Sequence, residues 1–362
     1  MIDARVSRLA EVLVGYSRKV KRGQVVMIAG PTAAEPLILE VGRCVLRAGG
    51  HPMYRMAPNA ASEVFYAEAG REQLAFLPKS ALVAAREADH YVNILAEINT
   101  QALAGVEPAR QRLTETARRP LMDLMLRKNE WVLSLFPTPA YAQDAGMGLE
   151  EFEAFVYAAA LTDRKDPVAE WRKARAMQER IIARLKGADR IRIVAPDTDL
   201  TMSVKGRKFL GAYGTHNMPD GEVFTGPVES SAEGRIRYTY PVCYRGKEVT
   251  DVRLEFEKGK VVKATAAKNE AFLAQMIDMD PGARRLGELG IGTNYGIARF
   301  IKNILFDEKI GGSVHLALGR SYAETGGRNR SALHWDMICD LRQGGRIEAD
   351  GKVLQEDGKF RL

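Results

Sequence analysis

Short apolar runs alternate with helical stretches through the first part of the chain, and this alternation constrains the fold more than any other feature. Residues 25–29 (VVMIA) form a candidate buried strand, and apolar positions recur at helical spacing over 36–48 until a Gly-Gly pair ends the helix. Further short apolar runs follow at 91–95 and 131–136. This strand–helix–strand repetition predicts an α/β domain with a mostly parallel sheet over residues 1–165.

The second half of the chain changes from helical to alternating periodicity. Charged and apolar residues alternate over 190–196 (RIRIVAP), and the period-two pattern returns at 238–244 (YTYPVCY) and 252–266 (VRLEFEKGKVVKATA). Within the last of these segments, Lys258-Gly259-Lys260 is typical of a hairpin turn. The pattern predicts a domain rich in antiparallel strands.

Helical patterns complete the second domain and join it to the first. They occupy residues 267–277 and 296–306, so we expect an α+β domain over 190–362. A helix with Pro167 near its start and basic residues in its last turn is predicted within 166–189, where it connects the domains. A length of 362 residues suits two domains of this size.

Charge and composition exclude several classes of function. The 53 basic and 46 acidic residues give a net charge of +7, but the basic residues are dispersed as on solvated faces, so we expect no nucleic-acid partner. No run of about 18 apolar residues predicts a membrane span, and the N-terminal segment lacks the apolar stretch of a signal peptide. The first strand is followed by GPTAAEP, which lacks the glycine-rich turn of a dinucleotide site. We therefore expect a cytoplasmic protein that binds neither membranes nor nucleic acid.

The cysteines agree with a reducing compartment. Cys44, Cys243 and Cys339 are odd in number, lie far apart in the sequence and form no C-x-x-C pair. Neither a disulfide framework nor a thiolate metal site is predicted.

Candidate metal ligands concentrate in the second domain. His334 and Asp336 are two residues apart, which places both on one face of an extended segment, where they can bind one ion. His315 lies in the apolar segment SVHLALG, while Glu222 and Glu288 each follow a glycine and adjoin apolar residues. If these carboxylates are buried, they need cations or hydrogen-bond donors.

Each of these residues also has a purely structural interpretation. An H-x-D triplet arises often by chance, an uncharged histidine in an apolar strand can be a hydrogen-bonded core residue, and a carboxylate after a glycine is commonly exposed at a turn. Zinc, cobalt and manganese all accept imidazole and carboxylate ligands. Five side chains are few for two ions, so a two-ion site requires one carboxylate to bridge.

Five segments, in order, resemble the thermophilic-type metalloaminopeptidases, the family of aminopeptidases T and S. They are NMPDGEVFTGPVE (217–229), LGELGIG (286–292), ILFDEK (304–309), HLALGRSY (315–322) and SALHWDM (331–337). A weaker likeness covers the N-terminal half through LVGYSRKVKRGQVVMIAG (13–30) and RCVLRAGGHP (43–52). Five motifs in order are far more specific than one H-x-D triplet.

The resemblance implies a function and a set of site residues. It implies a metal-dependent aminopeptidase, a hydrolase that removes N-terminal residues from peptides with a water activated by two divalent ions (zinc, cobalt or manganese), usually as a homodimer. The implied metal ligands are Glu222, Glu288, His315, His334 and Asp336. Glu288 is also implied to help activate the water, and the Tyr322 phenol to donate a hydrogen bond to the tetrahedral intermediate.

Two other functions stay open at this stage. An iron-dependent ring-cleaving dioxygenase resembling 2,5-dihydroxypyridine dioxygenase would use two histidines and one carboxylate, which His315, His334 and Asp336 could supply. That site would leave Glu222 and Glu288 without a role. The other alternative, the third hypothesis in all, is a binding protein that has kept the fold and lost catalytic activity. It stays open because only AETGGRNRSAL separates Tyr322 from His334, where family members carry a longer insertion.

Overall fold

The computed structural model describes residues 3–244 and 247–362 and divides into two compact units. Unit 1 comprises Met1–Glu170 with Gly214–Pro219, and unit 2 comprises Trp171–Tyr213 with Asp220–Leu362. Residues 214–219, which the predicted boundaries assign to the second domain, group with unit 1 because two of them pair with its sheet. A sequence pattern cannot show that a two-residue strand has joined a distant sheet.

Unit 1 contains a five-stranded parallel sheet, as predicted. The strand order is β2-β1-β3-β4-β8, and each neighbouring pair is parallel. The strands are β1 (Val25–Pro31), β2 (His51–Ala57), β3 (His90–Leu95), β4 (Trp131–Leu135) and β8 (Asn217–Met218). Strand β2 was not predicted, because as an edge strand it is largely exposed and lacks an apolar run.

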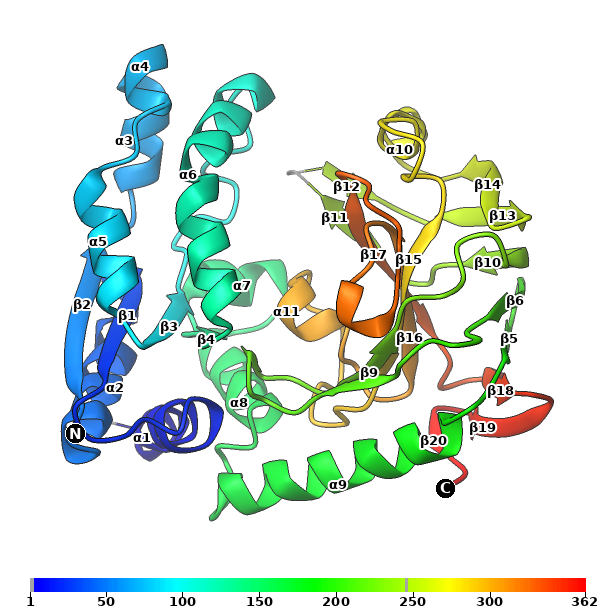
Figure 1. Cartoon of the computed structure of the whole chain (residues 1–362), viewed down its shortest axis with the longest axis horizontal. Helices are drawn as coiled ribbons and strands as arrows, with labels where there is room; N and C mark the ends of the chain where they lie inside the picture. The colour runs from blue at the N-terminus through cyan, green and yellow to red at the C-terminus, as the bar shows by residue number, and fades with distance from the viewer. Residues whose placement is uncertain (1–2, 245–246) are drawn as a thin grey trace. The chain divides into compact units, whose positions relative to one another are not determined.

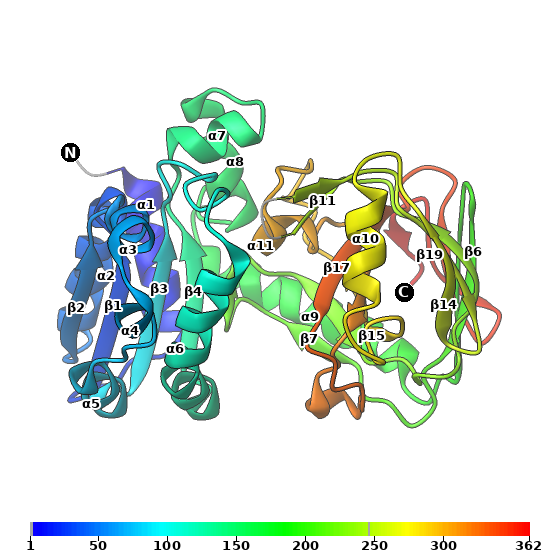
Figure 2. The same cartoon turned by 90° about the horizontal axis from the view of Figure 1, so that it is seen from above.

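Helices accompany this sheet (Figures 1 and 2). They are α1 (Ala4–Glu11), continued by a π-helical turn (Val12–Ser17), α2 (Glu35–Arg47), α3 (Ala61–Glu68), α4 (Arg71–Leu74), α5 (Lys79–Glu87), α6 (Pro108–Lys128), α7 (Pro139–Asp144) and α8 (Leu149–Ala159). Apolar residues of α5 and α6 pack with Met27 of β1 and Tyr91 of β3 in one buried cluster. Helix α9 (Pro167–Leu185) begins in unit 1 and continues in unit 2.

Unit 2 contains two antiparallel sheets. The larger has the order β14-β13-β10-β6-β5-β18-β19-β20, and the second has the order β17-β16-β15-β9-β7. The strands of the larger sheet are β5 (Arg190–Ala195), β6 (Thr198–Ser203), β10 (Glu233–Arg237), β13 (Arg253–Glu257), β14 (Lys260–Thr265), β18 (Arg346–Ala349), β19 (Lys352–Glu356) and β20 (Lys359–Phe360). The predicted turn at residues 258–260 joins β13 to β14. The predicted fold class is thus confirmed for both parts of the chain.

The smaller sheet of unit 2 has one apolar and one polar face. Its strands are β7 (Leu210–Ala212), β9 (Glu222–Thr225), β15 (Leu286–Gly292), β16 (Ser313–Gly319) and β17 (His334–Asp340). Alternate residues such as Leu289, Leu316 and Met337 enter the core that this sheet shares with the larger one. Because side chains alternate along a strand, the residues between them face the other side. That second face carries the candidate ligands.

Short elements complete unit 2: the antiparallel pair of strands β11 (Val242–Tyr244) and β12 (Lys247–Val249), and helices α10 (Glu270–Ile277) and α11 (Ile304–Asp307). The helix expected over 296–306 is wrong for most of its length, because Lys302 has a left-handed backbone with φ of 62° and the regular helix begins only at Ile304. In the described part of the chain, no helix has the length and apolar character needed to cross a membrane.

Candidate metal centre

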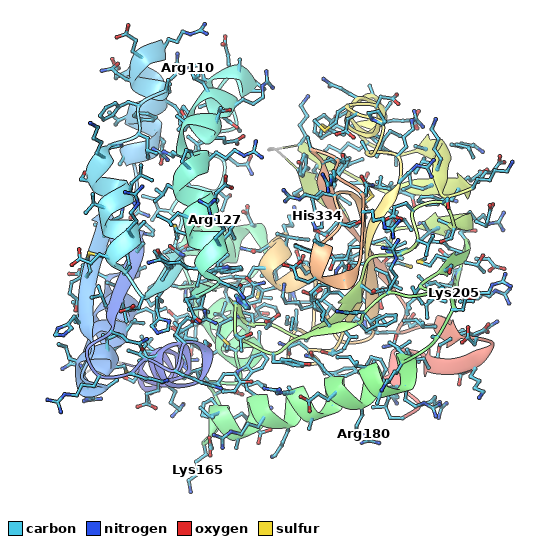
Figure 3. All side chains as sticks on the ribbon, viewed as in Figure 1. Arg110, Arg127, Lys165, Arg180, Lys205 and His334 are labelled. Carbon is cyan, nitrogen blue, oxygen red and sulfur yellow. The ribbon has the colours of Figure 1, made fainter. Side chains whose placement is uncertain are left out.

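Four neighbouring strands place five side chains on the polar face of the smaller sheet. Strand β9 supplies Glu222, β15 supplies Glu288, β16 supplies His315, and β17 supplies His334 and Asp336. The strand register brings them together, since Gly290 lies opposite His315 and Ala317 lies opposite Asp336. All the residues that the sequence and the resemblance singled out as ligands therefore meet at one place. His334 is labelled in Figure 3.

The five side chains form two groups that share Glu288. In the first, His315 Nε2 lies 3.1 Å from Glu222 Oε2 and 3.8 Å from Glu288 Oε1. In the second, His334 Nε2 lies 3.4 Å from Glu288 Oε2 and 3.4 Å from Asp336 Oδ2. Within each group the candidate ligand atoms lie within 4.8 Å of one another. The Glu288 carboxylate thus presents one oxygen to each group.

Backbone carbonyls orient both histidines. The Nδ1 atom of His315 lies 2.8 Å from the carbonyl oxygen of Glu308, and that of His334 lies 2.8 Å from the carbonyl oxygen of Arg320. If each Nδ1–H donates to its carbonyl, the lone pair of Nε2 points at the carboxylates, as in metal-ligating histidines. A lone pair facing a carboxylate oxygen is repulsive unless a proton or a metal ion lies between them.

Two buried carboxylate oxygens are poorly satisfied. Among the described residues, Asp336 Oδ1 accepts no hydrogen bond, and Glu222 Oε2 meets His315 Nε2 at 3.1 Å, which can donate to it when the imidazole is protonated. A buried charged oxygen without a donor is costly, so its presence requires an explanation. A divalent cation ligated by these oxygens and by the Nε2 atoms would satisfy all of them, so the residues present fit a metal.

The pKa values show a site that attracts positive charge. Burial lowers the pKa of His334, but Asp336 and Glu288 more than compensate and raise it to about 9. Burial likewise opposes protonation of His315, yet Glu222 and Glu288 raise its pKa well above its usual range. The pKa of Glu288 is raised by burial and by the neighbouring Asp336 and Glu222 carboxylates. Such clustering of perturbed groups is typical of functional sites.

The sequence interpretation assigned no role to two further residues at the site, Glu308 and Lys309. Glu308 forms a third group of potential ligands with His315 and Asp336. The Lys309 ammonium is completely buried, contacts the Glu308 carboxylate, and lies 4.0 Å from Glu222 Oε1. Both residues belong to the ILFDEK segment, which is one of the five motifs. The sequence does not show that these two side chains lie beside the ligands.

Tyr322 lies at the border of the second group. Its ring packs edge-on against Phe224, at 5.7 Å between centroids, and against the imidazole of His334, at 5.3 Å. The side chain remains 44% exposed, so it can meet a ligand that enters from solvent. Burial of the phenol and the carboxylates of the site raise its pKa, which keeps the hydroxyl protonated as a hydrogen-bond donor.

The fold and this cluster define a candidate divalent-metal centre, and comparison with known proteins assigns the chain to a family. The model of the thermophilic metalloprotease family (M29) matches residues 2–360. The chain belongs to this family, and the resemblance noted in the sequence is confirmed. As a member it is a metallopeptidase, and therefore a hydrolase.

Relatives with assigned names are aminopeptidases. Aminopeptidase 2 of Geobacillus stearothermophilus is 28% identical over 398 residues, covering 97% of this chain and 95% of the relative. Aminopeptidase T of Thermus aquaticus is 30% identical over 298 residues, covering 71% of each chain.

Two solved structures share the fold along nearly the whole chain. AmpT from Thermus thermophilus superposes with a TM-score of 0.85 at 24% identity, covering 99% of both chains. A 2,5-dihydroxypyridine dioxygenase from Pseudomonas putida KT2440 superposes with a TM-score of 0.59 at 15% identity, covering 99% of this chain and 98% of the other. At these sequence identities, both comparisons establish a shared fold and nothing about function.

Proposed function

We propose that this chain is an aminopeptidase that removes N-terminal residues from peptides with the help of two divalent ions. The observation that carries the proposal is the sharing of Glu288 between two three-residue ligand groups. Five side chains alone are few for two ions. Because the Glu288 carboxylate belongs to both groups, the five side chains supply three ligands to each ion. The aminopeptidase names of the relatives support the choice of substrate.

Each of the two groups of three potential ligands corresponds to one ion. Glu222, Glu288 and His315 would hold one ion, and Glu288, His334 and Asp336 would hold the other. Mixed imidazole and carboxylate ligands suit zinc, cobalt or manganese, and we propose one of these as the native metal. When bound, such ions polarise a peptide carbonyl and lower the pKa of a water molecule.

The protein contributes orientation and hydrogen bonding. The carbonyls of Glu308 and Arg320 hold the two imidazoles with their Nε2 atoms toward the carboxylates. Glu288 would help to activate the attacking water as the carboxylate shared by both ion sites, and the Tyr322 hydroxyl donates a hydrogen bond to the oxygen on which negative charge develops. The packing of the Tyr322 ring on Phe224 and His334 fixes the direction of this donor.

The geometry gives less support to the dioxygenase. Its iron would need His315, His334 and Asp336 as one set of ligands. In the part of the chain that the structure describes, each group of potential ligands contains only one of the two histidines. The shared fold is the remaining argument for that activity.

Metal analysis combined with peptide digestion tests the proposal. Protein purified without chelators should contain two divalent ions per chain and should shorten peptides stepwise from the N-terminus, as read by mass spectrometry. Release of no residue from a varied peptide panel by metal-loaded protein would contradict the proposal. A single iron per chain with oxygen uptake would favour the dioxygenase instead.

A matched pair of variants separates catalysis from folding. Glu288→Gln removes the shared carboxylate and should abolish turnover, whereas Glu255→Gln removes an exposed carboxylate of β13 that pairs with Lys263 and should leave turnover unchanged. Peptide binding without turnover in the wild-type protein would instead support a binding protein that has lost its chemistry.

We further propose that the protein works in the cytoplasm as a homodimer. The location rests on the three cysteines, which lie far apart and form no C-x-x-C pair, and the homodimer rests on the family resemblance. Light scattering coupled to gel filtration should give twice the 40.0 kDa mass of one chain.

A further inference from the structure

A cavity of about 150 Å³ adjoins the metal centre in unit 2. His334 and Asp336 line it and also belong to the second ligand group. Most of the remaining wall is apolar and includes Val242, Tyr244, Phe300, Ile304, Trp335 and Ile338. The cavity and the candidate metal centre thus share a wall.

The two other charged residues of this wall are engaged elsewhere. The Asp307 carboxylate, only 2% exposed, accepts a hydrogen bond of 2.8 Å from the backbone N–H of Ile301. The Lys302 ammonium pairs with Glu248 Oε2 at 3.4 Å. A ligand away from the metal ligands therefore meets mainly apolar side chains.

Interactions around the cavity hold its walls in place. The ring of Phe300 stacks on Tyr240, with 4.9 Å between centroids and 6° between planes. The Tyr240 hydroxyl donates to Asp340 Oδ2 at 2.9 Å and accepts a hydrogen bond of 2.6 Å from Arg342. The loop that carries Phe300 is thereby tied to the end of β17, which favours a cavity formed before any ligand binds.

The outer edge of β17 adds main-chain hydrogen-bonding groups to this wall. Strand β17 is the outer strand of its sheet. The Ile338 carbonyl accepts from Thr239 N at 3.0 Å, and Asp340 N donates to Thr239 Oγ1 at 2.8 Å, so even-numbered residues direct their backbone groups away from β16. His334 and Asp336 are also even-numbered residues of β17. Their N–H and C=O groups are therefore directed to this outer edge as well.

We propose that this cavity receives an apolar side chain at the N-terminal residue of the substrate, an inference that rests on the proposed aminopeptidase activity. The N-terminal residue carries the carbonyl that is cleaved, so its side chain must lie close to the metal ligands. A cavity of about 150 Å³ with apolar walls can hold a benzene molecule, so a leucine or phenylalanine side chain fits. A charged side chain would lose most of its hydration against these largely apolar walls.

Variants at the rim of the cavity test this inference. Ile304 lines the cavity and is 50% exposed, so Ile304→Trp fills space with little risk to folding. Val262→Trp is the matched control, because Val262 is 49% exposed on β14 and does not line the cavity. Peptides that differ only in an N-terminal alanine, leucine or phenylalanine are compared by kcat/KM.

The wild-type protein should favour leucine or phenylalanine over alanine by about 10-fold or more, the range expected for methylene groups in an apolar pocket. Ile304→Trp should lower kcat/KM for phenylalanine by about 10-fold and leave alanine nearly unchanged. Equal effects on all three substrates, or the same selectivity change in Val262→Trp, would overturn the inference.

Calorimetric binding of free L-phenylalanine separates this inference from the proposed function. If the protein cleaves no peptide, the proposed function fails, yet phenylalanine should still bind the metal-loaded protein and bind about 10-fold more weakly to Ile304→Trp. If peptides are cleaved but Ile304→Trp changes neither selectivity nor phenylalanine binding, the cavity is not the side-chain pocket and the proposed function stands.

Discussion

Lys309 has the most demanding environment of the residues around the candidate metal centre. Its ammonium is completely buried among carboxylates, in contact with Glu308 and 4.0 Å from Glu222. These carboxylates raise the pKa of Lys309 even though burial opposes the charge. A lysine in such a place compensates negative charge that would otherwise be buried without a partner.

Replacing Lys309 by methionine should therefore destabilise unit 2. Removal of one partner of a buried ion pair typically costs about 3–5 kcal/mol, because the other charge stays buried. Urea unfolding of the metal-free variant, followed by tryptophan fluorescence, measures the loss. The double variant Glu308→Gln/Lys309→Met should recover part of it, since both charges are then gone. Unchanged stability in the single variant would show that the ammonium is dispensable.

Tyr322 allows a test of catalysis that leaves the metal centre intact. Tyr322→Phe keeps the ring contacts with Phe224 and His334 and removes only the hydroxyl. Loss of one hydrogen-bond donor to a developing oxyanion lowers kcat by about 100-fold or more, so we expect that decrease with KM and metal content little changed. Tyr54→Phe, at a similarly exposed tyrosine of unit 1, should retain full activity. A normal kcat in Tyr322→Phe would exclude the proposed role.

At the level of residues, the sequence alone could not distinguish ligands from ordinary polar residues. His334 and Asp336 could be placed on one face of a strand from their spacing. Glu222 and Glu288 belong to other strands, and only the ordered motifs linked them to the histidines. Glu308 and Lys309 were missed because a charged pair beside a helix end is usually exposed, and nothing in the spacing shows that this pair is buried.

The strands of the smaller sheet make room for the site through a glycine. Gly290 of β15 lies opposite His315 of β16, and a Cβ added at Gly290 would lie 2.0 Å from the Cε1 and Nε2 atoms of the imidazole. Real Cβ atoms do not approach so closely, so the ring occupies the space that the glycine leaves free. The position of the imidazole thus depends on a residue of the neighbouring strand.

Gly290→Ala should consequently displace the His315 imidazole and weaken metal binding. We expect a loss of at least one ion per chain, because a ligand or its orienting partner typically contributes about 10- to 100-fold in metal affinity. Metal content after dialysis is the measurement. Gly105→Ala is the control, since a Cβ there would meet nothing within 4 Å. Full retention of both ions by Gly290→Ala would show that the sheet can adapt.

Elements with a strong local pattern were predicted well from the sequence. The buried strands β1, β3 and β4, helix α9 and the hairpin β13–β14 each have clear periodicity. The exposed edge strand β2 and the short strand β8 do not, because their places are set by partners distant in sequence. The segment at 296–303 has apolar residues at helical spacing, but its backbone follows the loop that lines the cavity.

At the scale of the whole molecule, the two units differ in what holds them together. The described core of unit 1 is formed by apolar side chains between helices and the parallel sheet, as in the cluster around Met27 and Tyr91. Unit 2 also has an extensive apolar core, but the polar face of its smaller sheet buries Glu222 and Glu288 beside Asp336. Without a metal ion, Lys309 and the protonated histidines offset part of the mutual repulsion of these carboxylates, and a bound ion would offset more.

Metal removal should therefore lower the stability of unit 2 and leave that of unit 1 almost unchanged. An ion at a concentration of 100 times its dissociation constant stabilises the folded state by about 2.7 kcal/mol, and this contribution is lost when a chelator removes it. Hydrogen exchange followed by mass spectrometry should show faster exchange in β9, β15, β16 and β17 after chelation, with β1 and β3 unaffected. Chelator saturated with zinc beforehand is the control. Equal acceleration in both sheets, or none in either, would show that the ions do not stabilise the sheet proposed to bind them.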